Sequence, residues 1–234
     1  MAHPSRRTAL TTAFAAALAT SLVACSGSNS ADSTSTATEQ ENSQTATEAN
    51  GSADNGSDSA ATVPDGYTAV KLPDINMSFA VPSGWETLTS TDAADAERVS
   101  AFTQATGLDA DSVQLKLETY SMLCAAVAQS DTTEEIDVRV DATVNELRTE
   151  EEISADNKEN GLGAVDLSVS TTTTGTGAEA RTMSYSIDLL GKMQYTTMIN
   201  TLNPDGNGIV LFSITSTASA ERAQELAEAI LSSI

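Results

Sequence analysis

The sequence predicts an α+β domain in which helices cover an antiparallel sheet. Several segments between residues 136 and 215 alternate apolar and polar side chains, which is the period of a half-buried strand. Short Gly-rich turns separate the later segments, as expected when consecutive strands pair in an antiparallel meander. Residues 219–234 carry an apolar stripe at helical spacing, which predicts a helix that covers one face of the sheet.

The first strands are expected at residues 70–72 and 77–81, on either side of a turn at Pro73 and Asp74. The segment that follows, up to Trp85, interrupts regular structure. Trp85 is the only tryptophan and could line a ligand groove, but a tryptophan directly after a strand more often packs at the edge of a core.

Two helices should follow. The first is expected to begin at a cap formed by Thr91 and Asp92 and to end at Gly107, and Asp109 should cap a second helix or turn. The apolar residues that would face inward are Val99, Phe102, Val113 and Leu117.

The apolar stretch at residues 122–128 predicts a buried strand that contains Cys124. No His or Lys is close to Cys124 in sequence, so a buried, inert thiol is favoured over a reactive one. With Cys25 modified as described below, Cys124 has no partner for a disulfide within the chain.

A third helix is expected from the capping box Thr143-x-x-Glu146 to about Asn160. Within it, Glu150 to Glu152 could gather a cation, although a solvent-exposed helix face is the favoured interpretation.

The remaining strands are expected at residues 136–140, 165–169, 183–189, 193–202 and 209–215. Tyr185 and Tyr195 should serve in packing. Residues 205–208, Asp-Gly-Asn-Gly, resemble part of a calcium loop, but the closing Glu is missing and a hairpin turn is favoured. Ser219 is the expected N-cap of the last helix, whose stripe comprises Ala223, Leu226, Ala227, Ile230, Leu231 and Ile234.

Three stretches carry a family resemblance: FAVPSGWE, AEARTMSYSIDLLGKMQYTTMI and GIVLFSITSTASAERAQELAEAILSSI. Over about residues 66–234 the chain resembles the LpqN-type lipoproteins of actinobacteria, which in turn resemble the PsbP-like α/β/α sandwich. The resemblance implies a curved antiparallel sheet covered by helices, and a setting in the cell envelope. It implies no catalytic residues, and PsbP-like domains mostly act through partners.

Residues 1–24 have the features of a signal peptide. Arg6 and Arg7 precede a 15-residue apolar run from Ala9 to Val23, which is shorter than the roughly 20 residues that a membrane-spanning helix needs. The arginines fit ordinary secretion and twin-arginine export equally well.

The run ends in a sequence that resembles a bacterial lipobox, with Leu22, Val23 and Ala24 before Cys25. The resemblance implies that cleavage makes Cys25 the new N-terminus and that its thiol carries diacylglycerol. Two acyl chains, such as palmitate, anchor a protein stably, so the membrane is expected as a partner through Cys25, on the outer face of the cell membrane. The alternative is ordinary cleavage after Ala24, with Cys25 left free.

Residues 25–62 should form a disordered linker ahead of a domain at residues 63–234. Between Ser26 and Thr62 there are 15 Ser or Thr and six Asp or Glu, no basic residue, and no apolar side chain other than Ala. Such a composition cannot bury enough surface to offset the backbone entropy lost on folding.

Charge and composition restrict the function. The domain has 27 acidic and nine basic side chains, so nucleic acid and anionic lipid are disfavoured as partners. The favoured interpretation of this charge is a soluble surface, although it could also attract cations or basic partners. His3, the only histidine, falls in the signal peptide, which excludes histidine-based catalysis and His-ligated metal sites, and no cofactor motif is present.

We therefore expect a non-enzymatic, lipid-anchored protein that binds or positions a partner protein in the envelope. A carrier of a small molecule or lipid is the alternative, and would need an apolar pocket of about 300 Å³ or more. The residues expected to line it are Met77, Met183, Met193 and Met198. A carboxylate-dependent hydrolase is a third hypothesis, which requires two buried acids at a cleft, one with a raised pKa.

Overall fold

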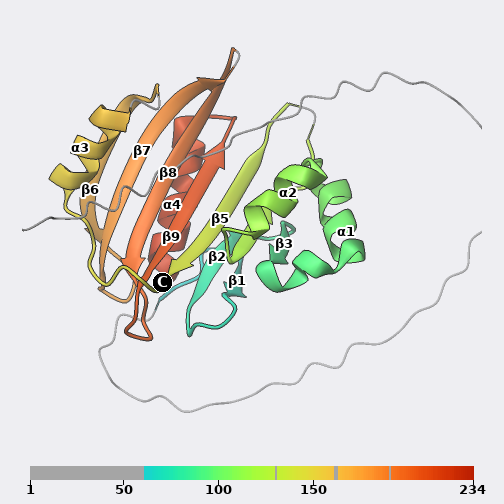
Figure 1. The fold of residues 1–234 in the computed structure, drawn as a ribbon, viewed down its shortest axis with the longest axis horizontal. Coiled ribbons are helices and arrows are strands. Elements are labelled where there is room, and N and C mark those ends of the chain that lie inside the picture. The colour runs from blue at the N-terminus through green and yellow to red at the C-terminus, as the bar shows by residue number, and fades with distance from the viewer. Residues whose placement is uncertain (1–60, 130, 161–162, 190) are drawn as a thin grey trace, which may run out of the picture. The chain divides into compact units, whose positions relative to one another are not determined.

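A computed structural model describes residues 61–129, 131–160, 163–189 and 191–234 (Figure 1). The predicted signal peptide, the lipobox residues Leu22, Val23 and Ala24, Cys25 and the linker up to residue 60 therefore lie outside the described residues. The strands are β1 (Tyr67–Lys71), β2 (Ser78–Pro82), β3 (Glu86–Thr89), β4 (Met122–Ala125), β5 (Glu134–Asp141), β6 (Val165–Thr173), β7 (Glu179–Leu189), β8 (Lys192–Leu202) and β9 (Ile209–Ser216). The helices are a 3₁₀ helix (Ser90–Ala94), α1 (Ala96–Thr106), α2 (Ala110–Leu117), α3 (Glu150–Asn160) and α4 (Ala220–Ser233).

The predicted α+β fold is confirmed. A seven-stranded sheet has the order β3-β4-β5-β9-β8-β7-β6, and every neighbouring pair is antiparallel. The meander of β7, β8 and β9 is as expected, and β6 extends it by one strand. The strands β1 and β2 form a separate antiparallel hairpin. No helix in the described part of the chain combines the length and apolar character needed to cross a membrane.

The helix α4 and the β1–β2 hairpin cover one face of the sheet. The aromatic rings of Phe79 in β2 and Phe212 in β9 meet edge to face, with centroids 5.1 Å apart. Around them lies the larger core, which comprises Leu72, Met77, Val81, Met122, Cys124, Ile136, Val138, Ala180, Ile199, Val210, Ile214, Leu226, Ala227, Ile230 and Ile234. This face is buried because most side chains of the central strands that point towards α4 and the hairpin are apolar.

Within the described residues, the opposite face carries helices only towards its two edges. Figure 1 looks onto this face, with α1 and α2 at the β3 and β4 edge, α3 at the β6 edge and α4 behind the strands. A second core beneath α1 and α2 comprises Leu88, Val99, Phe102, Val113, Leu117, Leu123 and Ala125. At the other edge, the hydroxyl of Thr171 donates to Glu150 Oε1 at 2.6 Å.

The first helical segment begins differently from the prediction. Asp92 accepts hydrogen bonds from the backbone N–H and hydroxyl of Thr89 and so caps the 3₁₀ helix, not α1. The N-cap of α1 is Asp95, whose carboxylate accepts from the N–H groups of Glu97 and Arg98. Gly107 ends α1 in the left-handed conformation, as expected.

The predicted start of α3 was wrong by six residues. Thr149 and Glu152 form the capping box, with Thr149 N–H donating to Glu152 Oε2 at 2.9 Å and Glu152 N–H to Thr149 Oγ1 at 3.2 Å. The hydroxyl of Thr143 instead donates to Asp141 Oδ1 at the end of β5. Two sites fit the capping pattern, and only the second precedes a segment that packs on β6.

The other two caps follow the prediction. Asp109 accepts from Ser112 N–H at the start of α2, and Ser219 accepts from Arg222 N–H at the start of α4.

Three separate segments satisfy the polar groups at the C-terminal end of α4. Gly175 and Thr176, from the β6–β7 loop, donate to the carbonyls of Leu231 and Ile234, and Thr62 donates to Ser232. The hydroxyl of Ser233 accepts from Ala80 N–H in β2 at 2.8 Å. The helix end is therefore fixed by chain segments that are distant in sequence.

Substitution of Gly175 by Ala should destabilise the domain, because a Cβ there would lie 2.1 Å from the carbonyl oxygen of Ser232. We expect a loss of about 2–3 kcal/mol in the free energy of unfolding, measured by urea denaturation. Gly177→Ala is the control, since nothing lies within 4 Å of its Cβ and only its positive φ opposes the change; that should cost about 1 kcal/mol. Equal losses in the two variants would contradict the close approach of the loop to α4.

Candidate functional site

The uncovered middle of the sheet is the candidate site. Along β9, the residues that face α4 are buried, while every second residue, on the opposite face, is half-buried. Three cross-strand rows from β5, β9, β8 and β7 make up this surface, which we term the open face. The rows are Arg139, Leu211, Asn200 and Arg181; Asp137, Ser213, Met198 and Met183; and Glu135, Thr215, Thr196 and Tyr185.

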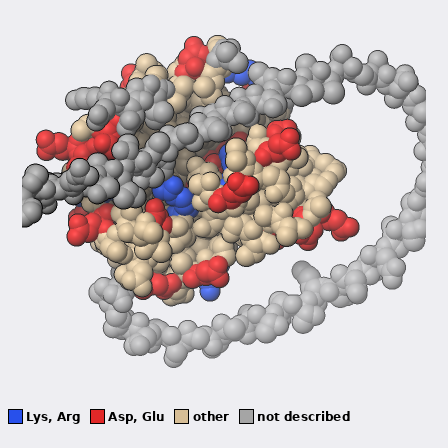
Figure 2. Space-filling view, in the orientation of Figure 1, with Lys and Arg blue, Asp and Glu red and all other residues tan. Residues whose placement is uncertain are grey.

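Ten of these twelve side chains are half-buried, and only Asp137 and Thr196 are buried. Figure 2 shows basic side chains near the middle of this side of the molecule and acidic side chains scattered over the helices and margins. The open face mixes apolar, hydroxyl and charged groups, so it differs from the larger core beneath α4, which consists of apolar side chains.

Arg139 and Arg181 lie at the two ends of the first row. Arg139 Nη2 is 3.6 Å from Asp141 Oδ2, and Arg181 Nη1 is 2.7 Å from Glu179 Oε1. The Arg181 side chain is only 13% exposed, and its enclosed Nε atom has no hydrogen-bond partner among the described residues. Buried polar groups in folded proteins nearly always have such a partner, so Arg181 is an exception that needs a reason.

A charged cluster joins α2 to the edge of the open face. Lys116 Nζ lies 2.9 Å from Asp137 Oδ2 and also contacts Glu135 Oε2. Burial raises the pKa of the Asp137 carboxyl to about 6, against the opposing charge of Lys116. Burial also lowers the pKa of Lys116, but the charges of Asp137 and Glu135 outweigh this and hold it above its ordinary range.

This cluster meets two requirements of the hydrolase hypothesis, namely two poorly exposed acids and one raised pKa. However, the ammonium group of Lys116 contacts both carboxylates and neutralises much of their charge. Burial and the charge of Asp137 also raise the pKa of the neighbouring Tyr120. The arrangement is therefore that of a structural ion pair that fastens α2 to β5.

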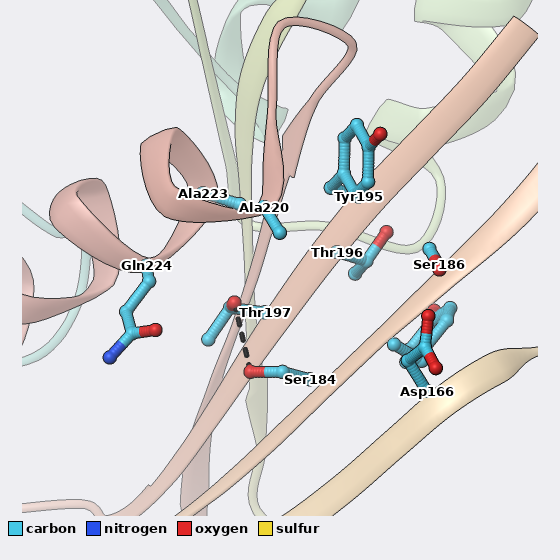
Figure 3. A pocket seen from close by; sticks show the side chains of 10 residues that line it. Asp166, Ser184, Ser186, Tyr195, Thr196, Thr197, Ala220, Ala223 and Gln224 are labelled. Carbon is cyan, nitrogen blue, oxygen red and sulfur yellow. Dashed lines mark hydrogen bonds between the residues drawn. The ribbon is translucent and has the colours of Figure 1, made fainter.

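A small cavity lies on the other side of the sheet, beside the first turns of α4 (Figure 3). Its volume is about 120 Å³, and it is lined by Asp166, Ser184, Tyr185, Ser186, Tyr195, Thr196, Thr197, Ala220, Ala223 and Gln224. The hydroxyls of Ser184 and Thr197 are 3.1 Å apart, and the backbone of Asp166 has a φ of 56° within a β-bulge. The cavity is smaller than the roughly 300 Å³ of a usual ligand pocket.

The four methionines proposed for a carrier pocket do not line this cavity. Met77 is part of the larger core, and Met183 and Met198 face each other across two strands of the open face. Met193 pairs with Asp188, next to the turn of the β7–β8 hairpin.

The structure also places the other residues selected from the sequence. Trp85 is half-buried and packs against the larger core. Cys124 is buried, and burial raises the pKa of its thiol well above the ordinary range. Tyr185 and Tyr195 project from opposite faces, because Tyr185 pairs with Thr196 and Tyr195 with Ser186.

Acidic side chains of both stretches take part in hydrogen bonds within the fold. Glu150 accepts from Thr171, Glu152 belongs to the α3 capping box, and Asp205 of the β8–β9 turn accepts from the N–H of Asn76. Among the described residues, no group of three or more His, Cys, Asp and Glu side chains is placed to hold a metal ion.

The sequence did not predict that Arg139 and Arg181 lie in the same cross-strand row. Arg139 occupies a polar position of the strand predicted at residues 136–140, but Arg181 precedes the strand predicted at residues 183–189, so no local signal indicated that they share a face. The row forms because β9 inserts between β5 and β8, which alternation along single strands does not reveal.

Asp137→Asn should change the pH dependence of stability. Because the pKa of Asp137 is raised in the folded state, folding favours the protonated carboxyl. The contribution of Asp137 to the free energy of unfolding is therefore complete below about pH 4 and is lost as the pH rises to about 6. The free energy of unfolding of the variant, minus that of the wild type, should therefore rise by about 1–3 kcal/mol between pH 4 and pH 6.

Asp92→Asn is the matched control for this pH series. Hydrogen bonds from Thr89 lower the pKa of Asp92, so its contribution to stability is present above about pH 4 and is lost as the pH falls. The free energy of unfolding of Asp92→Asn, minus that of the wild type, should therefore fall as the pH rises. Urea denaturation across the pH range measures both differences. A difference for Asp137→Asn that stays flat or falls would contradict the raised pKa.

No known protein family matches the chain, and no curated protein matches it in sequence. Among solved structures, the chain is similar to LpqN of Mycobacterium tuberculosis, a protein involved in cell envelope biogenesis, with 13% identity, a TM-score of 0.39, and coverage of 71% of this chain and 87% of LpqN. It is similar to Mog1p, a Ran-binding protein of Saccharomyces cerevisiae, with 12% identity, a TM-score of 0.39 and coverage of 70% and 84%. It is also similar to PA94 of Pseudomonas aeruginosa, with 11% identity, a TM-score of 0.36, and coverage of 69% of this chain and 90% of PA94. The relation to these proteins is one of fold only.

Proposed function

We propose that this protein is a lipid-anchored extracytoplasmic lipoprotein that works without catalysis, by binding a partner protein of the cell envelope through the open face. The observation that carries the proposal is the alternation along β9, where one side is sealed under α4 and the other is left half-exposed in the middle of a seven-stranded sheet. A central sheet face that no other described element covers is suited to contact with another macromolecule.

The composition of the open face fits a protein partner. Leu211, Met198 and Tyr185 supply apolar area, while Asn200 and Ser213 supply hydrogen-bonding groups beside them. Protein interfaces combine these classes, with aromatic, Met and Arg residues enriched. Because the surface extends over four strands, it suits an extended contact better than capture of a small molecule.

The carrier alternative has less support. The cavity beside α4 holds about 120 Å³, which is less than half of the volume expected for a ligand pocket.

The proposed anchor rests on the signal peptide and the lipobox in the sequence. Cys25→Ala should abolish incorporation of labelled palmitate and move the protein from the membrane fraction to the soluble extracytoplasmic fraction. Cys124→Ser is the matched control, since Cys124 is buried in the core and should leave labelling unchanged. Labelling that survives in Cys25→Ala would contradict lipidation at this residue.

The proposed binding face can be tested in cells with a photo-crosslinking amino acid at Ser213, which lies at the centre of the open face. We expect a specific crosslinked product that contains an envelope protein. The control position is Glu228, which is exposed on α4 on the other side of the sheet. Equal products from both positions, or none from Ser213 in folded protein, would contradict the proposal.

A further inference from the structure

We propose that the outer edge of β6 binds an extended segment of a partner protein, which pairs with it as a further antiparallel strand and places a basic side chain beside Glu150. This inference goes beyond the proposed function, because it concerns the edge of the sheet and not the open face. It starts from the strand order, in which β6 has β7 on one side and no described strand on the other (Figure 1).

A hydrogen bond at the β6–β7 turn shows which backbone groups of β6 point outwards. Thr174 N–H donates to the carbonyl of Ala178 at 2.8 Å, so these two residues form a hydrogen-bonded pair. Hydrogen-bonded and non-hydrogen-bonded pairs alternate along an antiparallel ladder, and the register is continuous over this part of β6. The N–H and C=O groups of Val169, Thr171 and Thr173 therefore point away from β7.

These outward groups are accessible. Among the described residues, no hydrogen bond engages them, and Thr171 and Thr173 are exposed while Val169 is half-buried. Proteins protect sheet edges with Lys, Pro or bulges, but residues 169–173 contain no Lys or Pro, and the bulge near Asp166 lies before them. An unprotected edge strand is a template for pairing with another chain.

The other edge of the sheet is short and partly covered. The strand β3 has only four residues, α1 packs beside it, and the Arg98 guanidinium donates to the carbonyl of Thr87 at 3.3 Å. Of the two edges, β6 is therefore the one that offers a row of backbone groups to a partner.

The side chains of β6 indicate what the added strand carries on its α4 side. Ser170 and Thr172 lie on this side, since Thr172 pairs with Ala180 of the larger core, and Ser170 Oγ is 2.7 Å from Thr182 Oγ1. Hydroxyl side chains pair favourably across neighbouring strands. Thr is therefore suited to the partner positions opposite Ser170 and Thr172.

On the other side of the sheet, Glu150 gives the edge a preference for positive charge. Thr171 Oγ1 donates to Glu150 Oε1 at 2.6 Å, so this exposed carboxylate lies beside the middle of the free edge. Arg148, which precedes α3, forms its ion pair with Asp156 instead. The partner residue opposite Thr171 would lie about 4.8 Å further out on the same side, so a Lys there can reach Glu150.

The same charge disfavours a second copy of this chain as the occupant. Antiparallel pairing of two β6 strands about Thr171 would bring two Glu150 carboxylates to one side of the joined sheet, near the two-fold axis. Like charges across neighbouring strands repel, and each chain also carries a formal net charge of −22. The occupant is therefore a different protein, with a basic residue between Thr residues in an extended segment.

The test measures backbone amide exchange of the full-length protein in non-ionic detergent by NMR, with and without the peptide Gly-Val-Thr-Lys-Thr-Val-Gly. At nine-tenths occupancy, the N–H groups of Val169, Thr171 and Thr173 should exchange about tenfold more slowly, because exchange then proceeds from the free fraction alone. The N–H groups of Ser170 and Thr172 are the internal controls, since they face β7 and should change little.

Two changes test the pairing and the charge. An N-methyl group on the Lys amide, which would face β6, should weaken binding by about tenfold or more, whereas N-methylation of the first Thr, whose amide would face away, should have a smaller effect. Glu150→Gln should weaken binding about threefold, as for an exposed ion pair, and Gln can still accept from Thr171. Glu228→Gln is the matched control, because Glu228 is exposed on α4 and should leave the affinity unchanged.

Unchanged exchange at the three outward amides in the presence of the peptide would overturn the inference, and so would equal binding of the two N-methylated peptides. Protection of these amides that grows with protein concentration in the absence of peptide would also overturn it, in favour of self-association. Crosslinking from Ser213 tests the open face independently. If the peptide fails to bind while Ser213 still crosslinks to an envelope protein, this inference fails and the proposed function stands.

Discussion

The burial of α4 against the sheet and the β1–β2 hairpin is the constraint on which the rest of the structure depends. Leu226, Ala227 and Ile230 of the helix are almost fully buried in the larger core, between Phe79 of the hairpin and the β8–β9 region of the sheet. The end of the helix receives backbone donors from the β6–β7 loop and from Thr62, and Ala80 of β2 donates to its Ser233 hydroxyl. Removing such an amphipathic helix would expose apolar area across most of the sheet.

This packing makes the two faces of the sheet unequal. Beneath α4, the strands carry Ile and Val at alternate positions, and Arg222 ties the start of the helix to Glu134 of β5 with two hydrogen bonds, from Nε at 3.0 Å and Nη2 at 3.2 Å. On the other face, the helices of the described residues pack only near the two edges. The middle strands therefore carry polar and mixed side chains there.

Charge on the open face is arranged in neighbouring pairs. Lys116 joins Glu135 and Asp137 at one edge, while Arg139 and Arg181 each lie near one acid from their own strand. Of the two arginines, Arg181 has the less exposed side chain, and its enclosed Nε atom has no hydrogen-bond partner among the described residues. A strongly acidic domain thus retains half-buried positive charge on the open face.

The sequence by itself determined the features that depend on neighbouring residues. The alternation in β5 to β9, the stripe and N-cap of α4, the turn at residues 205–208 and the burial of Cys124 could all be predicted, because each is a local matter of period, capping or polarity. Only the tertiary structure decided between the two capping boxes before α3, because Thr143 and Thr149 have the same local pattern and packing on β6 selects the second. The row from Arg139 to Arg181 and the hydroxyl-lined cavity beside α4 also required the structure, because they arise from strand order and register between segments that are distant in the chain.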